Sequence, residues 1–290
     1  MTGLLRAELL KMLKRWMPYV LFLLMLIGAA TIIWLFGYVS YRDEGEIEFH
    51  ATALRTFVYP YSVPALLDSG QFWGAAFFVA ILATSTVATE HNWGTVRPAL
   101  VGGVSRARYL LTKLITLTLV SIVALLIVFG FGVLMSLWAS NAEGIAVPAP
   151  HPEGFSVGDL LIMILRTAFC MIPYGLLAFA LTVITRSTAV GIAATMGYMT
   201  LEGIIVALLS TGGDIFQDSR YLFLGHSVTV LMAENRFQDL DFNTIAFRDL
   251  GSPDQPGIWT ATGIIVAQSA AFLAAAFAVF LRRDITVSHG

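Results

Sequence analysis

The chain has 290 residues, of which 57% are hydrophobic and 12% are charged, and its mean hydropathy is +0.78. About a quarter of the residues in a soluble domain are charged, so this composition excludes an ordinary soluble protein and indicates a membrane protein. The formal net charge of −2 averages two sides of opposite sign, and we expect no nucleic-acid partner.

The first 17 residues predict an amphipathic helix. Apolar side chains recur at spacings of three and four residues, at Leu5, Leu9, Met12, Leu13 and Trp16. The charged residues Glu8, Lys11, Lys14 and Arg15 lie elsewhere on the helical wheel. We therefore predict an interfacial helix along the inner membrane surface, with its basic residues near anionic lipid headgroups, and a bend at Pro18 into the first span. The alternative is a plain extension of that span with snorkelling lysines.

Six apolar stretches are long enough to cross a bilayer, whose core of about 30 Å requires roughly 20 apolar residues per helix. They are Pro18–Val39, Phe72–Thr89, Leu114–Trp138, Leu160–Thr185, Ala189–Ser210 and Ile258–Leu281. Apolar residues surround each stretch on every side, which favours helices over the alternating strands of a barrel. We predict an all-α polytopic protein in which residues 1–290 form a single transmembrane domain.

The first apolar run is longer than the apolar region of a signal peptide, and no small-residue cleavage site follows it, so we expect it to remain as a helix. The single cysteine, Cys170, lies within the fourth run. An intrachain disulfide and a cysteine-based metal site are therefore excluded.

The distribution of basic residues predicts the orientation. The N-terminus, the 90–113 loop, the turn at Arg186 and the C-terminal tail together carry 11 of the 17 Lys and Arg residues. Short cytoplasmic loops retain such residues, so we place this side and both termini in the cytoplasm, with the spans in the plasma (inner) membrane. The opposite loops include residues 220–233, which are apolar but too short to span, and we predict a re-entrant segment there before the last helix.

Spans four and five are joined by only a few residues around Arg186 and should be antiparallel neighbours. Small residues such as Gly191, Gly197 and Gly203 can allow close helix approach, most simply within the subunit.

Two ionisable residues lie within predicted spans: Arg166 in the fourth and Glu202 in the fifth. A charge near the bilayer centre costs roughly 2.5–3.5 kcal/mol, so such residues usually find partners or face water. Both lie roughly 9–12 Å from the outer helix ends at 1.5 Å per residue. We therefore predict an Arg166–Glu202 contact, which either fixes helix register or belongs to a translocation path.

Sequence motifs for catalysis are absent. The chain has no G-x-x-x-x-G-K-[ST] phosphate loop, no H-E-x-x-H zinc motif and no G-x-S-x-G nucleophile elbow. We expect no catalytic residue, no metal site and no cofactor in this chain, which is therefore not itself an enzyme.

The segment "TEHNWGTVRPALVGGVSRARYLLTK", residues 89–113, lies between two apolar runs. It resembles the first cytoplasmic loop of the ABC-2 family of ATP-binding-cassette transporter permeases, in which an acidic residue, a Gly-Thr pair, an arginine, a Ser-Arg pair and a lysine recur in this order. The matching positions here are Glu90, Gly94, Thr95, Arg97, Ser105, Arg106 and Lys113. "TRSTAVG" at 185–191 and "RYLFLGHSV" at 220–228 also resemble segments of that family, although Phe223 stands where a proline is common.

The resemblance implies a type V exporter-like fold and a permease subunit of an exporter that pairs with a second permease, commonly a copy of itself. ATP and Mg²⁺ would be bound by separate ATPase subunits, which the 90–113 loop would contact. Gly94 and the Gly102–Gly103 pair can reverse the chain, and Arg97, Arg106 and Arg108 can form charge-assisted bonds to that partner.

Two other function classes stay open. One is an ion-coupled secondary transporter built around Arg166 and Glu202, and the other is a membrane anchor or assembly factor that transports nothing. A basic loop retained by the positive-inside rule would explain the charges of the 90–113 segment, but not its paired glycines or its length.

Overall fold

The structure is a computed structural model, and it describes residues 2–31, 59, 62–69, 76–94, 96–142, 156–210, 219, 222–235 and 257–282. Within these ranges all regular secondary structure is helical. The helices are α1 (Thr2–Leu13), α2 (Trp16–Thr31), α5 (Ser62–Ser69), α6 (Ala76–Asn92), α7 (Val96–Val101), α8 (Arg106–Ala142), α9 (Val157–Thr185), α10 (Thr188–Ser210), α12 (Leu224–Ala233) and α13 (Ile258–Arg282).

Four of the described helices, α8, α9, α10 and α13, are long and apolar enough to cross a membrane. The bent pair α1 and α2 adds a fifth if it is counted as one span, and α6 is a shorter apolar helix. The predicted span 18–39 is described only through Thr31, and the predicted span 72–89 is helical from Ala76. The all-α prediction therefore holds for the described residues, and the long apolar helices indicate a membrane protein.

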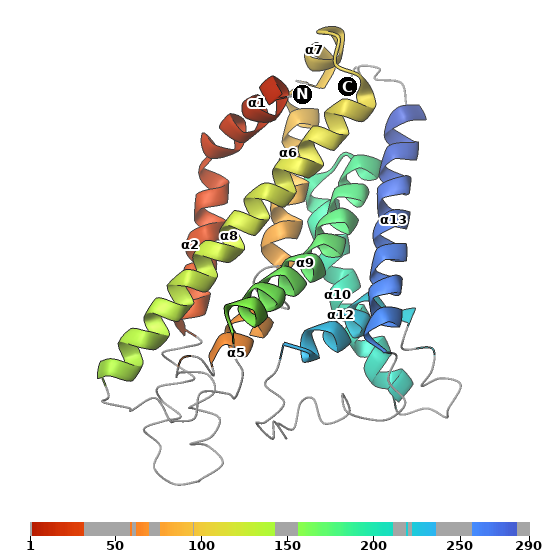
Figure 1. The fold of residues 1–290 in the computed structure, drawn as a ribbon. Helices are drawn as coiled ribbons and strands as arrows, with labels where there is room; N and C mark the ends of the chain where they lie inside the picture. Colours follow the sequence, from red (N-terminus) through yellow and green to blue (C-terminus); the bar gives the residue numbers. More distant parts are fainter. Residues whose placement is uncertain are drawn as a thin grey trace.

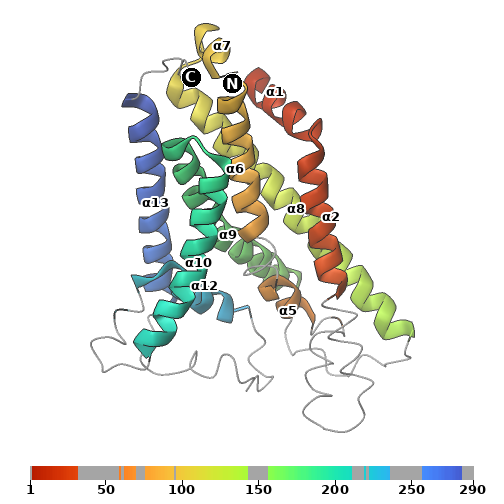
Figure 2. The same cartoon turned by 180° about the vertical axis from the view of Figure 1, so that it is seen from behind.

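The helices run between two ends of the molecule (Figures 1 and 2). The first end carries α7, the start of α8 and the last turn of α13, and we call it the α7 end. The second end carries α5 and α12. Helix α9 lies at the centre, because 67% of its most apolar window is buried, compared with 28% for α8 and 17% each for α10 and α13.

The bend between α1 and α2 lies earlier than predicted. The two helices meet at 65°, and the break falls at Lys14 and Arg15 rather than at Pro18. Pro18 lies in the first turn of α2, where its missing N–H costs nothing because helix starts leave those donors unpaired anyway. The proline therefore helps to begin α2 instead of interrupting a longer helix.

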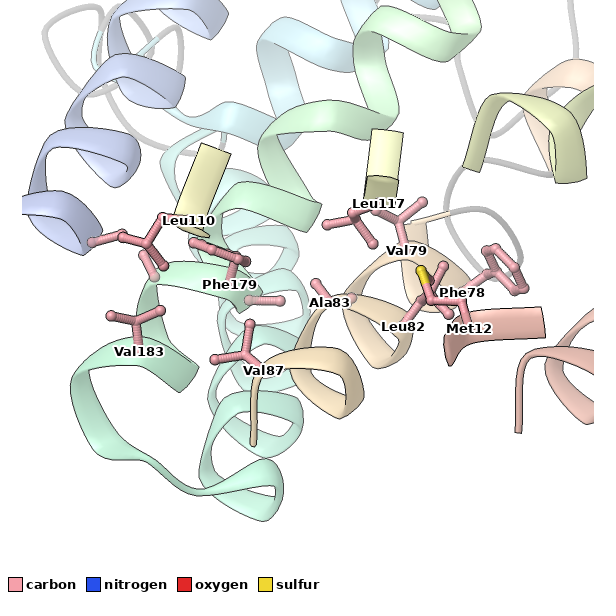
Figure 3. Packing of buried hydrophobic residues seen from close by; sticks show 14 of the residues in the cluster. Met12, Phe78, Val79, Leu82, Ala83, Val87, Leu110, Leu117, Phe179 and Val183 are labelled. Carbon is pink, nitrogen blue, oxygen red and sulfur yellow. The ribbon is translucent and has the colours of Figure 1, made fainter. Parts of the chain in front are cut away.

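The main apolar core joins α6, α8, α9 and α13 and also includes Met12 of α1. Figure 3 shows Met12 beside Phe78 and Leu82 of α6, and Leu117 of α8 beside Val79. Met12 is 5% exposed, so α1 is packed against the bundle at one point of its surface and is not held by the membrane surface alone.

The tight connection between α9 and α10 is confirmed. Arg186 ends α9 in the left-handed conformation, at φ 58°, and its N–H bonds the Thr182 carbonyl. Helix α10 begins two residues later and packs closely against α9 at Gly191, where an added Cβ would lie 2.2 Å from Thr182 Oγ1. A Cβ added at Gly197 or Gly203 would meet nothing within 4 Å. Of these three glycines, only Gly191 therefore has a packing role within the described chain.

Candidate functional site

Four charged side chains form a compact network at the base of α7, where α1, α6 and α8 meet. Glu8 and Lys11 come from α1, Glu90 from α6 and Lys113 from α8. Lys11 Nζ lies 2.8 Å from Glu8 Oε1 and 3.1 Å from Glu90 Oε1. Lys113 Nζ lies 3.1 Å from Glu8 Oε2 and 2.8 Å from Glu90 Oε2. Each lysine therefore bridges both carboxylates, and the four formal charges cancel.

Burial makes this network different from a surface ion pair. The side chain of Lys113 is 2% exposed, that of Glu90 4% and that of Glu8 7%. Lys113 also donates to the Thr86 carbonyl at 3.4 Å, so its ammonium group has three oxygen partners. Removing one member of a buried pair leaves an uncompensated charge and destabilises by about 3–5 kcal/mol, so α1 and the two ends of the 90–113 segment are energetically linked.

Aromatic side chains surround the network. The Tyr109 hydroxyl donates to Glu90 Oε2, and the Tyr109 ring lies 5.0 Å from Lys113 Nζ, in position for a cation–π contact. The same ring stacks on Phe280 of α13, with 5.8 Å between centroids. Arg15 extends the network on the other side, because its guanidinium lies 5.3 Å from the Trp93 ring and bonds Thr89 Oγ1 at 3.3 Å.

The charged partners set the ionisation of Glu90, which lies just beyond the predicted 72–89 span. Burial by itself raises the pKa of this carboxyl group, but the ammonium of Lys113, the hydroxyl of Tyr109 and the ammonium of Lys11 outweigh it and lower the pKa to about 2. Glu90 therefore stays ionised throughout the physiological pH range.

Helix α7 stands beyond the ends of α6 and α8 in both views of the fold (Figures 1 and 2). Two glycines with positive φ flank it, Gly94 at 66° and Gly103 at 87°, as predicted for chain reversals that other residues adopt with strain. Val101 is 80% exposed and Trp93 is 67% exposed, although Val96 is buried at 4%. The base of α7 is thus fixed in the bundle and its tip is open.

The predicted loop residues do not all lie on the surface. Glu90 and Lys113 lie in the buried network. Arg106 Nη1 donates to the Leu281 carbonyl at the end of α13, at 3.0 Å. Arg108 is exposed. The side chain of Arg97 and the whole of Thr95 lie outside the described residues.

The predicted loop is also shorter than expected, because residues 106–113 form the first two turns of α8. Ser105 begins this helix: its carbonyl accepts from the Tyr109 N–H and its hydroxyl accepts from the Arg108 N–H at 3.4 Å, which is an N-cap arrangement. The predicted boundary at Leu114 marked where the apolar run starts and not where the helix starts. Lys113 is therefore a rigid helical residue.

Sequence reasoning missed Glu8, Lys11 and Tyr109 as members of the network. We assigned the polar side of α1 to water and lipid headgroups, but Glu8 is buried. One signal could have identified it, since Glu8 is the only acidic residue before Asp43 and lies four residues from Met12 on one helical face.

The predicted Arg166–Glu202 contact is wrong, because Glu202 binds the start of α12 and Arg166 binds the turn that follows α12. Glu202 Oε1 accepts the Gly225 N–H at 2.7 Å and the Tyr198 hydroxyl at 3.3 Å. Arg166 Nη1 donates to Asn235 Oδ1 at 2.8 Å.

The two charges thus hold opposite ends of the short helix α12. Glu202 lies at its N-terminus and Arg166 beside the turn after its C-terminus, the placement that a helix dipole favours for each sign. Asn235, itself 1% exposed, also donates to Thr167 Oγ1 at 3.2 Å. The apolar segment predicted as re-entrant is a packed helix with both ends anchored, which gives the intramembrane charges a structural role.

Comparison with known proteins provides a family. A model of the family described as "Protein of unknown function (DUF2705)" matches residues 23–286, which is most of the chain. The chain belongs to the DUF2705 family. It is also 26% identical over 218 residues to the protein named "Uncharacterized protein YhcI" from Bacillus subtilis (strain 168), an alignment that covers 72% of this chain. The chain spans 64% of the length of that relative.

In this DUF2705 member, Glu8, Lys11, Glu90 and Lys113 at the base of α7 are bonded to one another across three helices. Beyond them, Val101 at the end of α7 is 80% exposed. Within the described ranges no three His, Cys, Asp or Glu side chains are grouped as metal ligands.

Proposed function

We propose that the chain is the transmembrane permease subunit of an ATP-driven transporter, of the ABC-2 type that its 89–113 segment resembles, and that α7 is the element on which a separate ATPase docks. The observation that carries this proposal is α7 itself. It projects from the bundle with Val101 80% exposed and is fixed at its base by a buried network of two glutamates and two lysines.

The surface of this end fits a protein partner. Trp93 is 67% exposed and Pro98, Gly102 and Arg108 are exposed, so apolar and cationic groups lie together. Protein interfaces are enriched in aromatic residues and arginine relative to the rest of a surface. This tip lies beyond the ends of α6 and α8 (Figures 1 and 2), where a protein partner can cover its exposed apolar side chains.

The buried network gives this docking element a route into the membrane domain. A push on α7 acts on Glu90 at the end of α6 and on Lys113 in α8, which are bonded to each other. Glu90 also binds Lys11 of α1, and Lys113 also binds Glu8 of α1. Tyr109 and Arg106 extend the connection to α13 through Phe280 and Leu281. For nucleotide to drive such a displacement, it must favour one docked arrangement over another.

The distribution of basic residues sets the orientation that we propose for the chain in the membrane. The α7 end carries most of the Lys and Arg residues, so we place it in the cytoplasm together with both termini, with six spans in the plasma membrane. A second permease copy or a related permease completes the transporter, and export of apolar or amphipathic cargo fits the apolar spans.

A matched pair of variants tests the docking role. Val101→Asp places a charge at the exposed tip of α7, and Val157→Asp places one at the opposite end, where valine is 75% exposed and an acidic residue suits the first turn of α9. We expect the native complex purified through the permease to contain an ATPase with wild type and Val157→Asp, and to lose it with Val101→Asp.

Two outcomes of this experiment would contradict the proposal. Recovery of the same partners with both variants, or recovery of no ATPase from the wild type under crosslinking conditions, refutes the assignment of α7. Transport that survives ATP depletion but stops when an ion gradient is collapsed would support a secondary transporter instead.

A further inference from the structure

A cavity lies between α6, α8 and α9 at membrane depth. It is a groove open on one side, with about 380 Å³ of space including its open mouth. On α8 it extends from Leu114 to Ile122, and on α9 from Ala168 to Leu176. Both ranges fall inside apolar helices that are long enough to cross a membrane.

Two parallel rows of side chains form the rim. Each row has the four-residue spacing that places residues on one helical face: Leu114, Thr118 and Ile122 on α8, and Ala168, Ile172 and Leu176 on α9. All six are at least partly exposed. The floor consists of buried residues, namely Val79, Leu117, Ser121, Met171 and Gly175. Figure 3 shows two of them, Leu117 and Val79, side by side.

Ser121 is the exceptional residue of this floor. It is 6% exposed and its hydroxyl has no hydrogen-bond partner. Other hydroxyls on α8 donate to the carbonyl four residues earlier, as Thr116 does to Thr112 at 2.9 Å and Ser140 does to Ser136 at 2.8 Å. A buried polar group without a partner is costly and rare, so the Ser121 hydroxyl is available to a molecule in the cavity.

We infer that the cavity binds an alkyl chain bearing a single oxygen function, an alcohol or a carbonyl, that enters sideways from the membrane. The apolar side chains of the rim and floor accept the hydrocarbon, and Ser121 supplies the hydrogen bond. This inference is independent of the ATPase proposal, because binding requires no nucleotide and no partner subunit.

Photolabelling in lipid nanodiscs tests the site. The probe is a long-chain alcohol that carries a diazirine and an alkyne tag, and the comparison probe is the same chain without the hydroxyl. We expect saturable labelling of peptides from 114–122 and 168–176 by the alcohol, displaced by excess unlabelled decanol. Labelling that rises linearly with probe and spreads over all lipid-facing helices would refute a binding site.

Variants separate the hydrogen bond from the cavity. Ser121→Ala should raise the half-saturating concentration of the alcohol roughly three- to tenfold, the equivalent of one neutral hydrogen bond, and should leave the hydroxyl-free probe unchanged. Its matched control is Ser140→Ala, which removes a buried hydroxyl of the same helix that is already bonded. Equal effects of the two substitutions would refute the role of Ser121.

Ala168→Phe should abolish labelling, because the larger side chain fills the rim. Val123→Phe should not, because Val123 is 53% exposed on α8 and does not line the cavity. Protection of Cys170 from a thiol reagent reports folding of each variant, and Ile172→Phe replaces Ala168→Phe if the latter unfolds. Crosslinking of the pocket peptides to a second copy of the chain, in place of the probe, would show a subunit contact and would overturn the inference.

Discussion

Replacing Lys113 with methionine removes the most deeply buried charge of the network while keeping a side chain of similar length. The ammonium group has oxygen partners at 2.8 Å in Glu90, 3.1 Å in Glu8 and 3.4 Å at the Thr86 carbonyl. Without it, the cation that the two nearly buried carboxylates still share is Lys11, whose side chain is 47% exposed. Breaking a buried pair in this way costs about 3–5 kcal/mol.

The chain contains its own reporter for this loss. Cys170 is the only cysteine and is fully buried, so the onset of its reaction with a fluorogenic maleimide on heating marks unfolding. At roughly 2–4 °C per kcal/mol for proteins of 150–250 residues, Lys113→Met should lower the apparent Tm by about 6–20 °C. Lys14→Met is the matched control, because Lys14 is exposed and lies directly after α1, three residues from Lys11.

A double variant sharpens the test. Glu90→Gln together with Lys113→Met removes one charge of each sign, so it should cost less than the sum of the two single variants, with a coupling of about 1–3 kcal/mol. A Tm for Lys113→Met within 1 °C of the wild type, or strict additivity in the cycle, would refute the claim that the network fixes α1 to the base of α7.

Three further outcomes follow from the structure. The pKa of Glu90 is about 2 in the folded chain and 4.5 as its ordinary value. Its ionisation therefore stabilises the fold above about pH 4.5, and this contribution is lost as the pH falls towards 2. Tm measured by circular dichroism should fall less across this pH window for Glu90→Gln than for the wild type. Arg106→Ala removes the bond to the Leu281 carbonyl and should increase amide hydrogen exchange in the last turn of α13 without changing α12. Gly225→Ala places a Cβ 3.1 Å from Glu202 Oε2 and should lower the apparent Tm, whereas Gly263→Ala, which meets nothing within 4 Å, should not.

The sequence predicted what depends on apolar length and on local turn chemistry. The helices α8, α9, α10 and α13 each cover a predicted span, since a run of about 20 apolar residues has few alternatives to a helix in lipid. The turn at Arg186 and the reversals at Gly94 and Gly103 were also readable, because a few neighbouring residues determine them.

The partners of charged side chains were much less predictable. Arg166 and Glu202 lie at matching depth on neighbouring helices, but depth and adjacency do not specify the rotation of each helix about its axis. In the structure Glu202 binds the start of α12 and Arg166 binds Asn235 just after it, and the chain reaches both partners only after Glu202. Glu8 was misjudged for the same reason, because its partner Lys113 lies more than a hundred residues away.

The central position of α9 imposes an order on the assembly of the protein in the membrane. Helix α6 is synthesised well before α9, yet the two helices pack closely at Gly175, where an added Cβ would lie 2.4 Å from Val79 Cγ1. The face of α6 that packs on α9 therefore has no permanent cover until the α9 segment has left the ribosome. A nascent chain that stops before α9 exposes this face to quality-control proteases, and one that includes α9 hides it.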